Sequence, residues 1–201
     1  ILFFVISLII SVLIIRNLDI NFLYNTILIT AAFYLFFITL RDFFQRKYRN
    51  LSQITAHFSF SILILSILFN NIFSSEVITN LKINETYQAQ NLKISFESIE
   101  QENKQNFKAI KGKFVVEDQS GLIEVMQPEL RIYNQPNIVT SEADIKTNIF
   151  TDKFMTMNYV QNQDYFNIRY QVKPFMIWIW ISTILLCFSG CLSLIRKKYE
   201  N

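Results

Sequence analysis

The chain is poor in glycine, histidine and cysteine, and each shortage removes a class of chemistry. Glycine occupies three of the 201 positions, Gly112, Gly121 and Gly190, so neither a glycine-rich phosphate-binding loop nor a nucleophile elbow can form. His57 is the only histidine, which excludes a zinc site of the usual spacing. A Ser-His-Asp triad would need this same residue, which lies in an apolar segment apart from most of the acids.

The two cysteines, Cys187 and Cys191, stand four residues apart in an apolar segment. They do not form a Cys-x-x-Cys motif, and one helix places such sulfurs too far apart for an unstrained disulfide. We interpret them as small packing residues and not as a redox pair.

Apolar residues make up 51% of the chain and are gathered into blocks. A helix needs about twenty such residues to span a bilayer. Residues 22–40, 52–73 and 173–195 meet that length, whereas residues 1–15 fall short of it before Arg16. We therefore expect an integral membrane protein with about four transmembrane helices. We expect the first to be truncated, with the chain being the C-terminal part of a longer protein that is cut within this helix.

Basic residues concentrate in two short segments beside the spans, residues 41–51 and residues 196–201. They are Arg41, Arg46, Lys47 and Arg49 in the first segment and Arg196, Lys197 and Lys198 in the second. Such clusters mark the cytoplasmic or matrix side of a membrane. Residues 1–40 are then a membrane helical hairpin. The first cluster could also bind anionic lipid or nucleic acid, but the topology signal is the simpler interpretation, and we expect membrane lipid and no nucleic acid as a partner.

Residues 74–172 differ from the rest, with 13 acidic against 10 basic side chains, so the chain's net charge of +3 comes from the membrane flanks. Alternating apolar and polar residues predict half-buried strands. These strands lie at 92–97, 107–117, 122–126 and 130–133, with a closing hairpin from 154–160 and 165–172 and turns at 118–121 and 161–164. We expect a mainly antiparallel β domain, a sandwich or open barrel, inserted between the third and fourth spans. The spans before and after this domain run in opposite directions, and the basic segments lie on the cytoplasmic or matrix side. We therefore expect the domain on the periplasmic or intermembrane-space side.

His57 lies near the start of the span at 52–73. A polar side chain in a span usually faces the bundle interior and has a partner. The residues alone allow two interpretations, a ligand or a histidine hydrogen-bonded to a neighbouring helix. Trp178 and Trp180, at the outer end of the last span, are typical of an interfacial aromatic belt, although they could also wall a site for a flat apolar ligand.

Several sequence blocks, taken in order, resemble the C-terminal part of the CcmF family of cytochrome c maturation proteins. The blocks are Ala56-His57, Pro128 to Tyr133 (PELRIY), Ser141 to Ile145 (SEADI), Tyr170 with Lys173-Pro174-Phe175, and Trp178-Ile179-Trp180. The order and spacing of these blocks make the resemblance specific, and the resemblance covers nearly the whole chain. Two positions depart from the family pattern, Ser59 in place of the glycine of Ala-His-x-Gly and Ser189 in the glycine pair of the last span.

The resemblance implies part of a membrane haem lyase, which transfers haem from a haem chaperone to apocytochrome c with a thioredoxin-like or dithiol-bearing partner. The family holds a b-type haem between two membrane histidines, and His57 matches the second of them. The implied cofactor is thus haem b, with His57 as an axial ligand of the iron. The other histidine would come from the N-terminal part of the same protein or from a separate subunit. The implied task is electron transfer from quinol to the incoming haem, in the bacterial plasma membrane or the mitochondrial inner membrane.

Two other functional classes stay open, a structural docking subunit without haem and a transporter fragment. Only the third span carries an ionisable residue away from its ends, which disfavours a transport path. In the β domain the resemblance makes Glu142 and Asp144 candidates for partner contact, as it does Trp178 and Trp180. Because Ser141 followed by acids is typical of a helix start, we favour that role for the two carboxylates.

Overall fold

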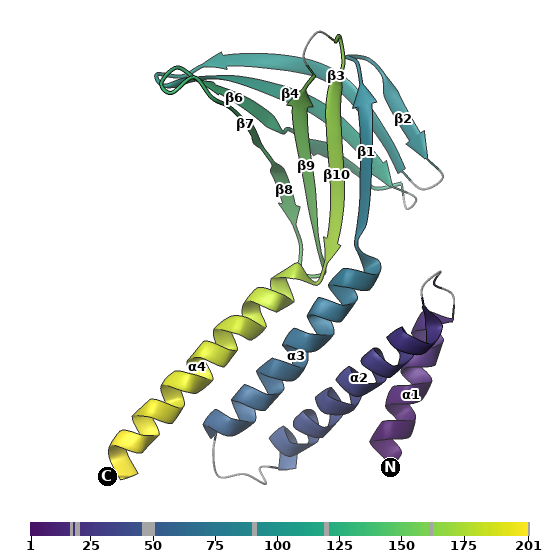
Figure 1. Cartoon of the computed structure of the whole chain (residues 1–201), viewed down its shortest axis with the longest axis vertical. Helices are drawn as coiled ribbons and strands as arrows, with labels where there is room; N and C mark the ends of the chain where they lie inside the picture. Colours follow the sequence, from purple (N-terminus) through teal and green to yellow (C-terminus); the bar gives the residue numbers. More distant parts are fainter. Residues whose placement is uncertain are drawn as a thin grey trace. The chain divides into compact units, whose positions relative to one another are not determined.

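The computed structural model describes residues 1–16, 18, 21–45, 51–89, 92–118, 121–160 and 163–200, with the backbone alone for 196–200 (Figure 1). The chain divides into two compact units. The helical unit comprises residues 1–73 and 174–201, and the β unit comprises residues 74–173. Each unit is described separately. The predicted basic side chains at 46–49 and 196–198 lie outside the described part.

The helical unit contains α1 (Leu2–Ile15), α2 (Phe22–Gln45), α3 (Leu51–Phe73) and α4 (Met176–Glu200). Among the described residues, three helices are long and apolar enough to cross a membrane, namely α2, α3 and the first 20 residues of α4. The first helix, α1, is apolar but has only 14 residues. The expected class, a multi-pass membrane protein with a short first helix, is therefore confirmed.

Helices that follow one another in the chain pack together, α1 on α2, α2 on α3 and α3 on α4. Phenylalanine rings fill the contact between α2 and α3, where Phe58 lies 6.0 Å from Phe36 and 5.7 Å from Phe43 between ring centroids. Several hydroxyl side chains in the helices donate to the carbonyl one turn earlier, as Ser7 does to Phe3 at 2.7 Å. This bond satisfies the hydroxyl without water, which a membrane helix requires.

The β unit is built from two antiparallel sheets (Figure 1). The strands are β1 (Ser75–Leu81), β2 (Thr86–Ala89), β3 (Leu92–Asn103), β4 (Phe107–Asp118), β5 (Ile123–Met126), β6 (Glu129–Tyr133), β7 (Val139–Glu142), β8 (Asp144–Thr147), β9 (Thr151–Tyr159) and β10 (Phe166–Pro174). One sheet has the order β1-β10-β9-β8. The other has the order β2-β3-β4-β6-β7, with β5 paired to β4.

The core of the β unit lies between the two sheets. Its centre is the stacked pair Phe96 and Phe114, whose ring centroids are 4.3 Å apart and whose side chains are fully buried. Met155 and Met157 of β9, both fully buried, pack against this cluster from the other sheet. Buried residues alternate with less buried ones in the first half of β3 and the second half of β4. Each strand therefore turns one face toward this core, as the sequence pattern predicts.

The strands predicted at 92–97, 107–117, 122–126 and 130–133 are confirmed as β3 to β6, and the closing hairpin as β9 and β10. At the first predicted turn, the amide of Gly121 donates to the carbonyl of Asp118 at 3.0 Å, and a φ of 75° explains the glycine. Residues 119–120 and 161–162 of the two turns lie outside the described residues.

The helix start predicted at Ser141 is wrong. Residues 139–142 form β7, which pairs with β6, and residues 144–147 form β8, which pairs with β9. The local capping signal is overridden by pairing with strands already in place on either side. Asp144 accepts a hydrogen bond at 2.7 Å, but from the distant backbone amide of Gln127 and not from a helix terminus.

Gly112 lies on the buried face of β4, where a side chain would collide with the core. A Cβ there would lie 2.6 Å from Cε2 of Phe114 and 2.8 Å from Sδ of Met157. We expect Gly112→Ala to lower the free energy of unfolding by about 1–3 kcal/mol through overpacking, measured as the thermal midpoint in detergent. Gly190→Ala is the control, because its Cβ meets nothing within 4 Å. Equal midpoints for the two variants would contradict the packing described here.

Tyr170 of β10 is buried, and this burial, with a smaller effect of the Glu124 and Asp118 carboxylates, raises the pKa of its phenol to about 12. An unfolded tyrosine ionises at a pH of about 10. Tyr170 therefore stabilises the fold fully below that pH, and its contribution falls by about 1.4 kcal/mol per pH unit as the pH rises toward the folded pKa.

Replacing the phenol with phenyl tests this linkage. Between pH values of about 10 and 12, we expect the thermal midpoint of Tyr170→Phe to fall less steeply with pH than that of the unmodified chain. Parallel pH dependences would show that the phenol does not stay protonated in the folded state.

Candidate functional site

His57 lies in the second turn of α3, and the surroundings of this helix decide what its ring can reach. Three faces of α3 can be distinguished by their neighbours. One face packs on α2, one packs on α4, and the third is exposed along its length. This third face, the exposed stripe, is defined by Gln53, His57, Phe60 and Ile67, which recur at helical spacing.

The contact between α3 and α4 is a seam of serines. On α3 these are Ser52, Ser59 and Ser66, seven residues apart, and on α4 they are Ser182 and Ser189, also seven apart. The hydroxyl of Ser52 donates to the carbonyl of Ser189 at 2.8 Å, and at the other end Nδ2 of Asn70 donates to the carbonyl of Pro174 at 2.7 Å. The two helices are thus antiparallel. Small side chains allow such helices to approach closely. Ser59 is fully buried, so serine in place of the family's glycine is still small enough for this contact.

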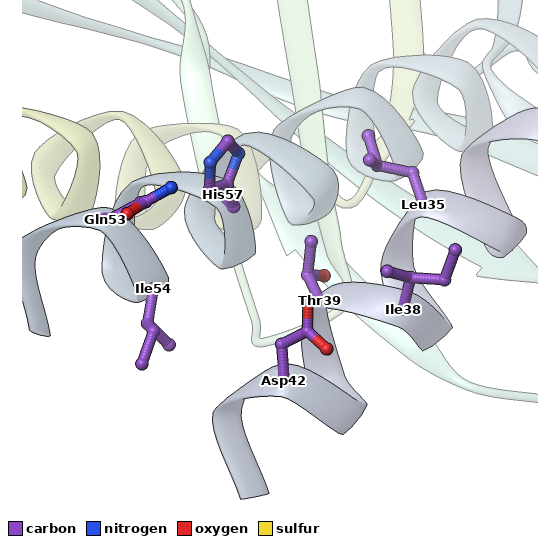
Figure 2. A pocket seen from close by; sticks show the side chains of 7 residues that line it. All are labelled: Leu35, Ile38, Thr39, Asp42, Gln53, Ile54 and His57. Carbon is purple, nitrogen blue, oxygen red and sulfur yellow. The ribbon is translucent and has the colours of Figure 1, made fainter. Parts of the chain in front are cut away.

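The contact between α2 and α3 combines aromatic packing with one polar bridge. The hydroxyls of Thr39 and Ser61 lie 3.0 Å apart across the two helices. Beside this bridge is a cleft of about 200 Å³. It is lined by Leu35, Ile38, Thr39, Asp42, Gln53, Ile54 and His57 (Figure 2). His57 therefore stands where the exposed stripe meets the cleft.

Figure 2 shows the His57 ring at one rim of the cleft and the Asp42 carboxylate at the opposite side. Asp42 is already paired, since its Oδ1 accepts from the Arg41 guanidinium at 2.8 Å. Within the described part of the chain the His57 ring forms no hydrogen bond, although Gln53 lies one turn before it on the same stripe. An imidazole in a span without an internal partner is expected to bind something outside this chain.

The described residues contain no group of three or more His, Cys, Asp or Glu side chains that could hold a metal ion. His57 can offer one nitrogen, with apolar surface beside it on the stripe. Phe60 and Ile67 are each 48% exposed. One imidazole beside an apolar face fits an axial ligand of a flat macrocycle, for which a second ligand must come from another segment. It does not fit a metal ion bound by this chain alone.

Trp178 and Trp180 are not among the residues that line the cleft beside His57. Trp178 is half-buried and Trp180 is 61% exposed, and because residues two apart lie on nearly opposite sides of a helix, they do not form one wall. Cys187 and Cys191 are free and exposed on α4 within the described part of the chain. Both lie off the serine seam, which carries the contact with α3, and their role in packing stays a prediction.

Glu142 and Asp144 have partners within the β unit. Oε1 of Glu142 accepts from the Thr140 hydroxyl at 3.3 Å and lies 3.9 Å from the Arg131 guanidinium. Arg131 is bonded more closely to Glu129, at 3.1 Å, and this hydrogen bond is the main reason that the pKa of Arg131 is raised. Both carboxylates therefore support the strand pairing around β7 and β8, whatever else they contact.

Sequence reasoning missed the cleft and its Thr39, Asp42 and Gln53. One signal was available, because Gln53 and His57 are four residues apart and hence on one helix face. No signal linked them to Asp42, which belongs to another helix.

Residues 72–174 match the family described as the CcmF C-terminal beta-sandwich. The cytochrome c-type biogenesis protein Ccl1 of Rhodobacter capsulatus is 30% identical over 120 residues, which cover 60% of this chain and 18% of that protein. CcmF of Pseudomonas fluorescens is 26% identical over 145 residues, 72% of this chain and 22% of that protein. NrfE of Haemophilus influenzae is 25% identical over 178 residues, 87% of this chain and 28% of that protein.

Among solved structures, the chain is similar to one called Cytochrome c Heme Lyase CcmF, with a TM-score of 0.69 and 13% identity. The similarity covers 95% of this chain and 33% of that structure, and at this identity it concerns the fold. The chain thus spans less than a third of the length of the curated relatives named above.

The serine seam predicts how Ser59 tolerates substitution. We expect Ser59→Leu to force α3 and α4 apart and to lower the free energy of unfolding by about 1–3 kcal/mol, because the buried hydroxymethyl group leaves no room for a larger side chain. The measurement is unfolding in mixed micelles of increasing denaturing detergent. Phe60→Leu, which places a leucine on the adjoining exposed stripe, should leave unfolding unchanged. If Ser59→Leu also had no effect, the seam would not hold the two helices together.

Proposed function

The chain belongs to the CcmF family, and from this we propose that it is the C-terminal portion of a membrane haem lyase, in which His57 is an axial ligand of a b-type haem. The observation that carries the proposal is the position of His57 on the one face of α3 that neither α2 nor α4 covers. An imidazole there is available to a group bound from outside this chain. The resemblance around Ala56-His57 supports the same residue.

The neighbouring residues suit this role. Phe60 and the rest of the exposed stripe offer an apolar surface for a porphyrin face, and Gln53 is the nearest polar side chain on that stripe. The serine seam and the Phe58 contacts hold α3 against two helices, so the ring projects from a rigid support. A haem held by two imidazoles would supply one-electron transfer. The second imidazole belongs to a segment outside this chain, from the same protein or from another subunit.

The proposed reaction is the transfer of haem from a haem chaperone to apocytochrome c, assisted by a thioredoxin-like or dithiol-bearing partner. In this scheme, the His57-bound group passes an electron from quinol to the incoming haem. The proposed location is the bacterial plasma membrane or the mitochondrial inner membrane. The β unit would face the periplasm or the intermembrane space, since the basic segments at 41–51 and 196–201 mark the other side.

The test is a spectrum. His57→Ala in the assembled complex should abolish the absorption band of the b-type haem while leaving the amount of chain in the membrane unchanged, because the exposed ring makes no contact that the fold needs. Gln53→Ala is the matched control, a polar side chain of the same stripe and cleft one turn earlier, and it should retain the band.

A band that persists in His57→Ala would contradict the ligand assignment. A complex that matures cytochrome c but contains no haem when purified would favour a docking subunit instead. In that case the β unit, and not His57, would be the functional part of this chain.

A further inference from the structure

A second cleft lies within the β unit, at the end where β3 turns into β4 and β9 turns into β10. Its volume is about 320 Å³. It is lined by side chains from both sheets, namely Ile99, Gln101, Ile110, Leu130, Ile132, Val139, Tyr159 and Phe166. All of these except Gln101 are aliphatic or aromatic. Val139 is 58% exposed and Tyr159 is 56% exposed, so the cleft opens to solvent.

Strand register shows which residues of the six-stranded sheet share the face that lines this cleft. Residues directly opposite one another in antiparallel strands point to the same face. Gln101 lies opposite Ile110, and Ile110 lies opposite Leu130, which gives one row across the sheet. The next row toward the end of the sheet consists of Asn103, Lys108, Ile132 and Val139. Lys108 therefore belongs to the cleft face of the sheet.

The ammonium group of Lys108 stands beside the apolar lining without a counter-charge. Lys108 is exposed, and its side chain has no hydrogen bond or ion pair among the described residues. On the other face of the same strands the charges are paired, since the ammonium of Lys111 lies 3.2 Å from Glu102 and 3.5 Å from Glu129. The other three residues in the row of Lys108 are uncharged. The rim of the cleft thus carries one unpaired positive charge.

The composition of the cleft is that of a small-molecule site. Such sites have volumes of about 300–1,000 Å³, mostly apolar walls and a few polar groups that fix orientation. This cleft is at the lower limit of that range, which favours a ligand with one narrow apolar body. The ion pairs on the other face of the sheet disfavour a broad protein contact there, because the cores of protein interfaces are depleted in charge.

The lining and the rim together define the ligand. Branched aliphatic side chains form most of the lining, and they pack well on a hydrocarbon chain. A group that pairs with the ammonium of Lys108 must be an anion, and a carboxylate accepts hydrogen bonds from an ammonium. The complementary ligand is an apolar chain that ends in one carboxylate.

We propose that this cleft binds a long-chain fatty acid. The acyl chain enters between the two sheets, against Ile110 and Leu130, and the carboxylate meets the ammonium of Lys108 at the rim. Burial of the chain supplies most of the binding free energy, and the ion pair decides which end of the ligand stays outside. The site lies entirely within the β unit, and it does not depend on haem ligation by His57.

The experiment maps where a fatty acid contacts the protein. The full chain is reconstituted in phosphatidylcholine nanodiscs and photolabelled with dodecanoic acid that carries a diazirine at the end of its chain. Labelled peptides of the β unit are identified by mass spectrometry, with and without an excess of unlabelled dodecanoate. The methyl ester of the same diazirine compound has the chain but no charge, so it tests the contribution of the carboxylate.

Two pairs of variants separate the cleft from its surroundings. Val139→Glu places a negative charge in the lining, whereas Ile138→Glu places it on the neighbouring exposed residue, which does not line the cleft. Lys108→Gln removes the ammonium at the rim, and Lys146→Gln removes an exposed lysine of β8, which contributes no residue to the cleft.

We expect the acid to label the lining segments of β3, β4 and β6, and unlabelled dodecanoate to suppress this labelling. Val139→Glu, Lys108→Gln and the use of the ester should each reduce it several-fold, whereas Ile138→Glu and Lys146→Gln should leave it unchanged.

Three outcomes overturn the proposal. The first is the absence of label in the β unit, and the second is label that is spread over this unit and resists competition, which shows non-specific partitioning. The third is equal labelling by the acid and the ester, or labelling that Lys108→Gln does not change, which shows that the cleft does not select a carboxylate. Each result leaves the His57 assignment untouched, since that assignment is tested by the haem spectrum.

Discussion

The hydrocarbon interior of a bilayer has no water to satisfy a polar group, and this constraint organises the helical unit. Serine and threonine hydroxyls in these helices return to their own backbone, as Ser7 and Ser59 do. Others meet across a helix contact, as Thr39 and Ser61 do. His57 has neither solution available in the described part of the chain. Because its imidazole has no hydrogen-bond partner there, His57 is expected to bind a group from outside this chain.

The antiparallel pairing of two chain segments occurs in both units. In the helical unit, α3 and α4 are joined at one end through Ser52 and Ser189 and at the other through Asn70 and Pro174. In the β unit the continuations of the same two segments, β1 and β10, pair over seven residues. A domain inserted between two spans must bring its ends together, and pairing its first strand with its last achieves this without a linker.

The sequence predicts where most helices and strands lie, but it does not predict which of their faces contact one another. Apolar blocks located the spans, and alternation located β3 to β6, because both patterns report burial directly. The signal failed at Ser141, where a local helix-capping pattern was overridden by neighbouring strands. The sequence also does not say which face of α4 meets α3, so it could not show that Cys187 and Cys191 lie off that contact. The sequence shows that Ser52, Ser59 and Ser66 are seven residues apart. It does not show that their helix packs against the one that carries Ser182 and Ser189.

The exposed stripe of α3 has two parts with different needs. Phe60 and Ile67 are stable against acyl chains, since lipid tails are as apolar as these side chains and no hydrophobic force drives them into a protein contact. Gln53 and His57 gain nothing from acyl chains, because a hydrogen-bonding group in hydrocarbon costs free energy until it is paired. Only the polar end of the stripe therefore demands a partner. The proposed haem would meet the needs of both parts, since its iron would take the imidazole of His57 as a ligand and its apolar periphery would contact the ring of Phe60.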